Sequence, residues 1–286
     1  MSSFERIGVV GAGQMGAGIA EVCARSGLDV MVCESSELSA NAARKRVEGS
    51  LDRAARRGKL TDETHARAVG GLTYTADLDA LGDRDIVIEA VYEDPAAKLE
   101  VLARLDKVVP PEVILASNTS SIPIINLAMA TERAERVVGL HFFNPVPVMP
   151  LVEVVPSLRT SVETVEAVTA LVTSALGKQV IRAKDRAGFV VNSLLVPYLL
   201  SAIRMLESGY ASAGDVDAGM RLGCAHPMGP LELADLIGLD TVKAIAESMY
   251  DEFKEPTFAP PALLLRMVEA RHLGRKTGTG FFEYAA

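Results

Sequence analysis

The chain has 286 residues, enough for two domains that each bury a core of their own. Hydrophobic residues make up 49% and charged residues 23%, an ordinary composition for a soluble globular protein. The formal net charge of −8 argues against a general nucleic-acid binder, because the phosphate backbone of a nucleic acid would be repelled.

Three widely spaced cysteines, Cys23, Cys33 and Cys224, form no C-x-x-C pair. Two of them lie in apolar stretches, and we interpret these two as small buried residues in a reducing compartment. We expect no zinc or other metal site. Residues 1–6 lead directly into an apolar strand without the features of a signal peptide. These observations predict a cytoplasmic protein.

One segment, residues 189–206, is rich in Val, Leu and Ile. Polar residues and Pro197 interrupt it, so it lacks the ~20 predominantly apolar residues that a membrane span needs. We expect a buried helix at a subunit contact and no membrane partner.

The first two-thirds of the chain alternate strand and helix signals. Strands are predicted at 7–10, 29–33, 85–90, 113–116, 137–140 and 151–155. Helices are predicted at 19–26, 96–108 and 161–176. Such alternation is typical of parallel strands joined by crossover helices, and it predicts an α/β fold with a Rossmann doubly wound sheet.

From about residue 184 onward the strand signals fade and helical periodicity takes over. Helices are predicted at 190–208, 213–222, 231–251 and 261–270, with glycine and proline in the connecting loops. We therefore expect a Rossmann domain at residues 1–183 and an all-helical domain at residues 184–286.

A glycine-rich turn follows the first strand directly and opens the first helix. It comprises Gly11, Ala12, Gly13, Gln14, Met15 and Gly16, the pattern G-x-G-x-x-G. Gly11 permits the tight turn, Gly13 lets the backbone approach a pyrophosphate, and Gly16 lets helix and strand pack closely. The helix N-terminus supplies free N–H groups to the anion. The turn therefore predicts a dinucleotide site.

Glu34 ends the second strand, 21 residues after Gly13. A carboxylate at this place hydrogen-bonds the adenosine ribose diol and disfavours a 2′-phosphate. The alternative is a solvated strand end. In this context Glu34 favours NAD as the cofactor over NADP.

Residues 44–59 carry seven positive and two negative charges in an otherwise acidic chain. The segment fits either a solvated helix face or a local site for a phosphorylated group such as coenzyme A. Composition favours neither of these two interpretations. Nucleic acid is the weaker third option, because no aromatic residues are interleaved.

Of the four histidines, only His141 lies at the end of a predicted sheet strand, where open α/β folds place their active crevice. Glu153 lies on the next strand, after a turn rich in proline, and could return beside His141. A carboxylate on one imidazole nitrogen fixes the tautomer and leaves the other nitrogen to take a proton. A structural histidine remains the alternative by position alone.

A run of small polar residues, 117–121, follows the strand at 113–116. It gathers hydrogen-bonding side chains at another strand end, although an N-cap and turn cluster would have the same composition. Spacing alone selects no one serine of the run.

Five stretches carry a resemblance along nearly the whole chain: GAGQMGAGIA near the start, SNTSS at 117–121, HFFNPVPVMPLVEVV at 141–155, DRAGFVVNSLLVPYL at 185–199 and GRKTGTGFFEY at 274–284. In this order they resemble the short-chain L-3-hydroxyacyl-CoA dehydrogenases, especially the bacterial 3-hydroxybutyryl-CoA members. The resemblance implies hydride transfer between NAD(H) and C3 of a short acyl-CoA, and a homodimer formed through the helical domain.

The resemblance also implies roles for individual residues. It assigns a catalytic dyad to His141 and Glu153, with Ser120 and Asn192 on the substrate oxygens. The implied cofactor contacts are the glycine turn, Glu34, Glu93, Lys98, Ser120, Asn144 and Lys276. The implied coenzyme A contacts are Ser50, Arg57 and Ser120, the first two inside the basic segment. The rival hypotheses are a hydroxy-acid dehydrogenase that uses no coenzyme A and a catalytically idle NAD-binding protein.

Overall fold

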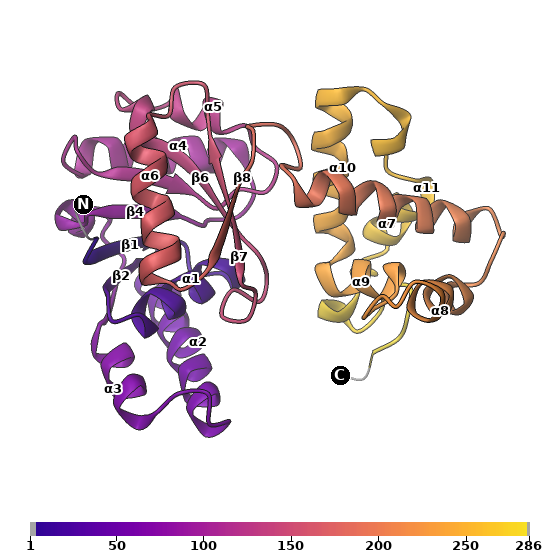
Figure 1. Cartoon of the computed structure of the whole chain (residues 1–286), viewed down its shortest axis with the longest axis horizontal. Helices are drawn as coiled ribbons and strands as arrows, with labels where there is room; N and C mark the ends of the chain where they lie inside the picture. Colours follow the sequence, from indigo (N-terminus) through magenta and orange to yellow (C-terminus); the bar gives the residue numbers. More distant parts are fainter. Residues whose placement is uncertain (1–3, 285–286) are drawn as a thin grey trace. The chain divides into compact units, whose positions relative to one another are not determined.

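The computed structural model describes residues 4–284 and divides into two units, Met1–Asp185 and Arg186–Ala286 (Figure 1). Residues 1–3, part of the segment from which a cytoplasmic location is predicted, lie outside the described residues. Each unit has a hydrophobic core of its own.

The first unit is built on one eight-stranded sheet with the strand order β3-β2-β1-β4-β5-β6-β7-β8. The strands are β1 Arg6–Val10, β2 Asp29–Cys33, β3 Leu72–Thr75, β4 Ile86–Glu89, β5 Ile114–Ser117, β6 Val137–Phe142, β7 Leu151–Pro156 and β8 Gln179–Arg182. The central strands β4, β5 and β6 are buried along their whole length, which explains their continuous apolar sequences. The predicted doubly wound α/β sheet is confirmed.

Two features of the sheet differ from the sequence prediction. The strands are not all parallel, because β7 runs antiparallel to β6. Only residues 143–150 join these two strands, and a parallel pair would need a longer crossover connection. The prediction also missed β3 and β8. Both are four-residue edge strands that carry polar residues, so neither has the apolar run of a central strand.

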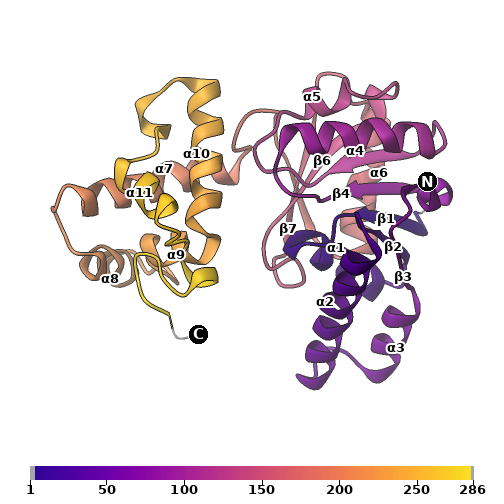
Figure 2. The same cartoon turned by 180° about the vertical axis from the view of Figure 1, so that it is seen from behind.

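Helices cover both faces of this sheet. They are α1 Gln14–Arg25, α2 Glu37–Arg56, α3 Asp62–Gly70, α4 Pro95–Val108, α5 Ile124–Ala128 and α6 Val162–Ala170. Three short elements, η1 Leu78–Asp83, η2 Ala134–Arg136 and the π-helical η3 Leu171–Ala175, complete the unit. Figure 1 has α6 in front of the sheet, and Figure 2, from behind, has α4 in front. Side chains of α1 and α6 share one core cluster, so these two helices lie on the same face.

The last residue of the first unit, Asp185, is bound to the start of α5. Its carboxylate accepts the backbone N–H groups of Ile124 and Ile125 at 2.7 and 2.8 Å. These bonds satisfy donors that a helix start leaves without intrahelical partners. They explain why the chain belongs to the sheet unit as far as residue 185.

The second unit consists of helices and their connecting loops. Its elements are α7 Val191–Glu207, α8 Ala213–Gly223, α9 Pro230–Ile237, α10 Leu239–Phe253, η4 Pro256–Phe258, α11 Ala262–Glu269 and η5 Arg275–Thr277. The single helix predicted at 231–251 is wrong, because α9 ends at Ile237 and α10 begins at Leu239. Gly238 between them has φ +101°, a backbone conformation that no α-helix contains.

The apolar segment 189–206 falls mainly on α7, which packs Leu199, Leu200 and Ile203 into the core of the second unit. Within residues 4–284, no helix combines the length and apolarity that crossing a bilayer requires. Two of the three cysteines, Cys23 and Cys33, are buried, in agreement with the prediction, and Cys224 is exposed.

Candidate active site

The glycine turn has the geometry of a nucleotide-binding turn. Gly11 has φ +84°, and a Cβ on it would lie 2.9 Å from the backbone oxygen of Ala90. A Cβ on Gly16 would lie 1.8 Å from the oxygen of Gly11, so helix α1 packs directly on the turn. By contrast, nothing lies within 4 Å of a Cβ on Gly13. The turn is therefore closed on the protein side and open at Gly13.

Helix α1 begins at Gln14 without a side-chain cap and without an acidic residue in its first turn. Its first N–H groups thus remain available to an anion, and Met15 follows within the same turn of helix. The residues present fit the pyrophosphate of a dinucleotide.

Two charged side chains converge on Ala12 in this turn. The Glu34 carboxylate, directly after β2, accepts the backbone N–H of Ala12 at 2.6 Å. Arg46 of helix α2 donates from its guanidinium to the carbonyl of the same residue. Glu34 thus lies where a carboxylate can meet an adenosine ribose, and Arg46 brings a positive charge to the same turn.

His141 and Glu153 occupy directly opposed positions in the antiparallel β6–β7 pair. Residues opposite each other on neighbouring strands project to the same face of a sheet. Nδ1 of His141 lies 2.7 Å from Oε2 of Glu153, and the two residues are 4% and 0% exposed. The strand pairing itself therefore brings the imidazole and the carboxylate together.

Ser120 completes a row of three side chains. Its Oγ lies 3.0 Å from Nε2 of His141, the ring nitrogen opposite the one that faces Glu153. The serine belongs to the loop after β5, and β5 is parallel to β6. The carboxyl ends of β1, β4, β5 and β6 share one edge of the sheet, so this row and the glycine turn lie along the same edge.

The loop that bears Ser120 is bound to Glu93. Oε1 of Glu93 accepts a hydrogen bond from the hydroxyl of Thr119 at 2.6 Å. The same oxygen accepts hydrogen bonds from the backbone N–H groups of Ser120 and Ser121 at 2.8 and 3.1 Å. Burial alone would raise the pKa of Glu93, but the Lys98 ammonium and these hydrogen bonds outweigh burial and hold the pKa below its usual range. Glu93 is therefore ionised at neutral pH.

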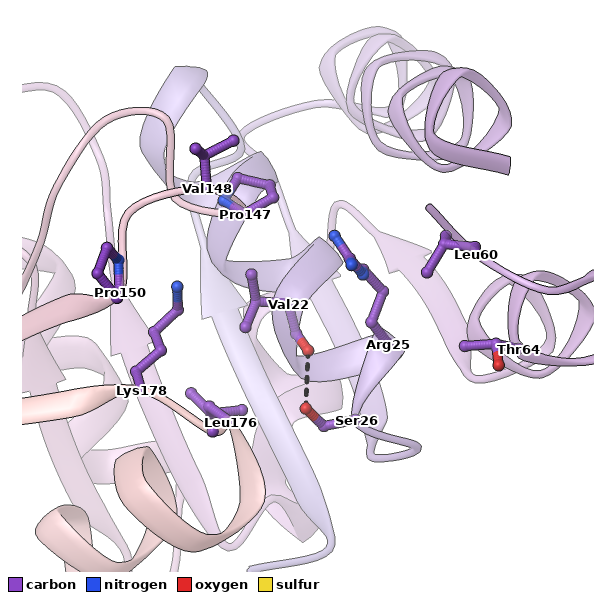
Figure 3. A pocket seen from close by; sticks show the side chains of 11 residues that line it. Val22, Arg25, Ser26, Leu60, Thr64, Pro147, Val148, Pro150, Leu176 and Lys178 are labelled. Atoms are coloured by element: carbon purple, nitrogen blue, oxygen red, sulfur yellow. Dashed lines mark hydrogen bonds between the residues drawn. The ribbon is translucent and has the colours of Figure 1, made fainter. Parts of the chain in front are cut away.

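Asn144 lies exposed in the loop 143–150 that joins β6 to β7. Lys178, just before β8, donates to the carbonyls of Val146 and Met149 in that loop at 2.7 and 2.6 Å. Figure 3 shows Lys178 beside a cavity of about 390 Å³ between this loop and the C-terminal end of α1. None of the predicted site residues lines this cavity.

The basic segment forms the second half of helix α2 and the turn after it. Arg46, Ser50, Arg53 and Arg57 follow one another at helical spacing, so they share one face of α2. Ser50 is half-buried, and the three arginines are exposed. This face begins at the glycine turn, where Arg46 touches Ala12, and continues to the end of α2.

Asn192 and Lys276 belong to the second unit. Asn192 is buried in the first turn of α7, and the Lys276 ammonium lies 2.6 Å from Oδ2 of Asp240. The first unit thus brings together the dyad, Ser120, Glu93, Lys98, Glu34 and the glycine turn, but not these two residues. Within residues 4–284 no three His, Cys, Asp or Glu side chains are grouped as metal ligands.

Sequence reasoning missed Glu89, a fully buried carboxylate at the end of β4. The available signal was its place, since a lone charge that ends an otherwise apolar strand lies at the edge where the other site residues gather.

Comparison with known proteins identifies the family. Residues 6–186 match the family model described as 3-hydroxyacyl-CoA dehydrogenase, NAD binding domain, and residues 188–284 match the C-terminal domain of the same family. The chain is 57% identical over 283 residues to a 3-hydroxybutyryl-CoA dehydrogenase of Mycobacterium tuberculosis, and the alignment covers 99% of each protein.

Solved structures give the same result. The crystal structure of M. tuberculosis FadB2 matches with a TM-score of 0.98 and 57% identity, covering 99% of this chain and 100% of that one. The (S)-3-hydroxybutyryl-CoA dehydrogenase PaaH1 of Ralstonia eutropha matches with a TM-score of 0.94 and 46% identity at the same coverage. The chain belongs to the 3-hydroxyacyl-CoA dehydrogenase family, and its first unit is the NAD-binding domain of that family.

Proposed function

We propose that the protein interconverts (S)-3-hydroxybutyryl-CoA and acetoacetyl-CoA with NAD(H). The observation that carries this proposal is the row Ser120–His141–Glu153, held at 3.0 and 2.7 Å on the edge of the sheet that also bears the glycine turn. The four-carbon acyl group of the proposed substrate is taken from the relatives of M. tuberculosis and R. eutropha, which are both named 3-hydroxybutyryl-CoA dehydrogenases.

The dinucleotide is held by the open backbone at Gly13, the uncapped start of α1 and the Glu34 carboxylate. Asn144 and Lys276 are further cofactor contacts by family resemblance. When bound, the nicotinamide accepts or returns the hydride of C3.

Proton transfer falls to the dyad. Nε2 of His141 accepts the proton of the C3 hydroxyl during oxidation, while Glu153 on Nδ1 stabilises the imidazolium that forms. In reduction the imidazolium returns this proton to the same oxygen. Ser120, already within hydrogen-bonding distance of Nε2, contacts the substrate oxygen. Asn192 is a further contact of the reacting oxygens by family resemblance.

The coenzyme A handle lies along the basic face of α2, with Ser50 and Arg57 as its contacts. Exposed guanidinium groups suit this role, because they bind phosphate oxygens through paired, charge-assisted hydrogen bonds. The face also explains why so acidic a chain gathers seven positive charges within residues 44–59.

The first test is the absorbance of the reduced nicotinamide after acetoacetyl-CoA is mixed with the protein and either NADH or NADPH. We expect rapid oxidation of NADH, slow oxidation of NADPH, and little turnover of free acetoacetate. Equal turnover of the free acid would favour a hydroxy-acid dehydrogenase that needs no coenzyme A. Tight binding of NADH without any oxidation of the cofactor would favour the hypothesis of a catalytically idle NAD-binding protein.

A homodimer formed through the helical unit is part of this proposal. Helix α7 exposes Leu194 over 76% of its surface, and Val190 and Met205 lie exposed at helical spacing from it. An apolar face of this kind is typical of a surface that a second copy covers. The cytoplasmic location stays a prediction.

We expect a dimer in analytical ultracentrifugation for the unaltered chain and a monomer for Leu194→Glu, because a buried carboxylate without a partner opposes association. Leu158→Glu is the matched control, since Leu158 is also an exposed leucine but lies in the first unit. A Leu194→Glu protein that remains dimeric would place the interface elsewhere.

A further inference from the structure

Glu89 is a carboxylate with no access to solvent. Its Oε1 accepts hydrogen bonds from the Lys98 ammonium and from the backbone N–H of Val91, both at 2.7 Å. Its Oε2 accepts a hydrogen bond from the hydroxyl of Ser117 at 2.5 Å. Both oxygens are therefore bound, and the orientation of the carboxylate is fixed from two neighbouring strand ends.

Lys98 is 1% exposed and has three acceptors around its ammonium group. They are Oε1 of Glu89 at 2.7 Å, the carbonyl of Val91 at 3.2 Å and Oε2 of Glu93 at 3.4 Å. The first two contacts are hydrogen bonds, and the contact with Glu93 is an ion pair. In this arrangement Lys98 connects a buried carboxylate to the carboxylate that binds the serine loop.

The contacts continue without a break to the dyad. Glu93 binds the backbone N–H groups of Ser120 and Ser121 through one oxygen, while its other oxygen faces Lys98. Ser120 then reaches His141 through Oγ. The position of the serine hydroxyl relative to the imidazole therefore depends on where Glu93 is held.

We infer that Glu89, Lys98 and Glu93 form a positioning network that fixes the loop 119–121 and thereby the Ser120–His141 hydrogen bond. This inference rests on the proposed function, because it assigns a role in the reaction to residues that need not touch the substrate. It gives Glu93 and Lys98 a purpose beyond their implied contacts with the cofactor, and it adds Glu89 to the site.

Stability alone is a poor explanation for this network. A buried ion pair contributes little net stability compared with a well-packed apolar pair of similar size, because removing both charges from water offsets their attraction. The network does provide geometry at the one edge of the sheet where the reacting groups meet. A displacement of about 1 Å in such groups can cost about 10²-fold in rate.

The test compares Glu89→Gln, Lys98→Met, Glu93→Ala and Glu93→Gln with the unaltered enzyme, using acetoacetyl-CoA and NADH. For the first three variants we expect kcat to fall about 10- to 100-fold. In Glu89→Gln, which removes no implied cofactor contact, the Kd for NADH should change less than about threefold. Glu93→Gln keeps an oxygen that can accept from the serine loop, so it should retain more activity than Glu93→Ala.

Hydrogen–deuterium exchange of the Ser120 and Ser121 amides gives a second readout that needs no turnover. These amides should exchange faster in Glu89→Gln and Lys98→Met, although neither residue bonds to them directly. Absence of activity in the unaltered chain would contradict the proposed function. The amide-exchange result would still show whether the network holds the loop 119–121 in place.

Asp106→Asn is the matched control. Asp106 forms another ion pair of the first unit, with the buried Arg133 at 2.6 Å. The Asp106→Asn variant should have a lower Tm, with unchanged kcat and unchanged amide exchange at Ser120 and Ser121. If Glu89→Gln does not fold, Ser117→Ala takes its place. It removes no charge, but it removes both the bond to Glu89 and the 3.3 Å bond that the Ser117 hydroxyl accepts from the backbone N–H of Thr119.

Three results would overturn the inference. One is that folded Glu89→Gln and Lys98→Met show the same kcat and the same amide exchange of Ser120 and Ser121 as the unaltered enzyme. Where Ser117→Ala replaces Glu89→Gln, the same result in that variant counts equally. Another is a rise in the Kd for NADH of Glu89→Gln that accounts for its whole loss of activity. The third is equal damage in Glu93→Gln and Glu93→Ala, since a network that acts through hydrogen-bond geometry predicts partial rescue by the amide.

Discussion

His141→Ala is expected to lower kcat for acetoacetyl-CoA reduction by about 10²–10⁴-fold, the range that general acid–base catalysis contributes. The Kd for NADH should change little, because the imidazole is bonded to Ser120 and Glu153 and His141 is not among the implied cofactor contacts. Stopped-flow absorbance of NADH oxidation and a fluorescence titration with NADH measure the two quantities separately.

The matched control is His272→Ala. His272 is an exposed histidine in the second unit, and its removal should leave kcat unchanged. Glu153→Gln provides a graded comparison, since the amide keeps the shape of the side chain and loses the charge that stabilises the imidazolium. Turnover by His141→Ala within about threefold of the unaltered enzyme would contradict the dyad.

Glu34→Ala is expected to change the choice between NADH and NADPH by about 10²-fold. Hydrogen bonds to a charged group contribute about 1.5–3 kcal/mol, so losing the ribose contact should raise the KM for NADH about 10- to 100-fold. Removing the carboxylate also removes its repulsion of a 2′-phosphate and leaves Arg46 on the same turn. Steady-state kinetics with both cofactors measure the change.

Two further variants identify the cause of this change. Glu34→Gln keeps an oxygen for the Ala12 N–H and for the ribose, so it should accept NADPH with a smaller loss of NADH affinity. Adding Arg46→Ala to Glu34→Ala should abolish the gain with NADPH. If NADPH remains unused in Glu34→Ala while the KM for NADH rises, a group other than Glu34 excludes the 2′-phosphate.

Much of the fold follows from apolar patterning. Strands β1, β4, β5 and β6 were predicted because central parallel strands are buried on both faces and read as continuous apolar runs. Edge strands such as β3 and β8 lack that pattern. The break at Gly238 escaped prediction because a glycine inside an apolar helical period fits a helix almost as well as a turn.

The site was predictable where its chemistry coincides with a strand end. His141, Glu34 and the glycine turn stand directly at or after strands, so their shared edge follows from the topology. Glu153 lies beside His141 because β7 runs antiparallel to β6. A proline-rich connection permits this reversal but does not require it, so the sequence alone did not fix the contact. The partnership of Glu89, Lys98 and Glu93 depends on side-chain packing that no linear pattern encodes.

The contact between Gly16 and the Gly11 carbonyl ties the nucleotide turn to the folding of the first unit. Because a Cβ at Gly16 would lie 1.8 Å from that oxygen, any side chain there separates α1 from β1 before it can disturb a bound dinucleotide. A cell carrying such a variant would therefore lose the protein to chaperones and proteases. The defect would be one of abundance, and a genetic screen would record it as loss of the enzyme and not as weak cofactor affinity.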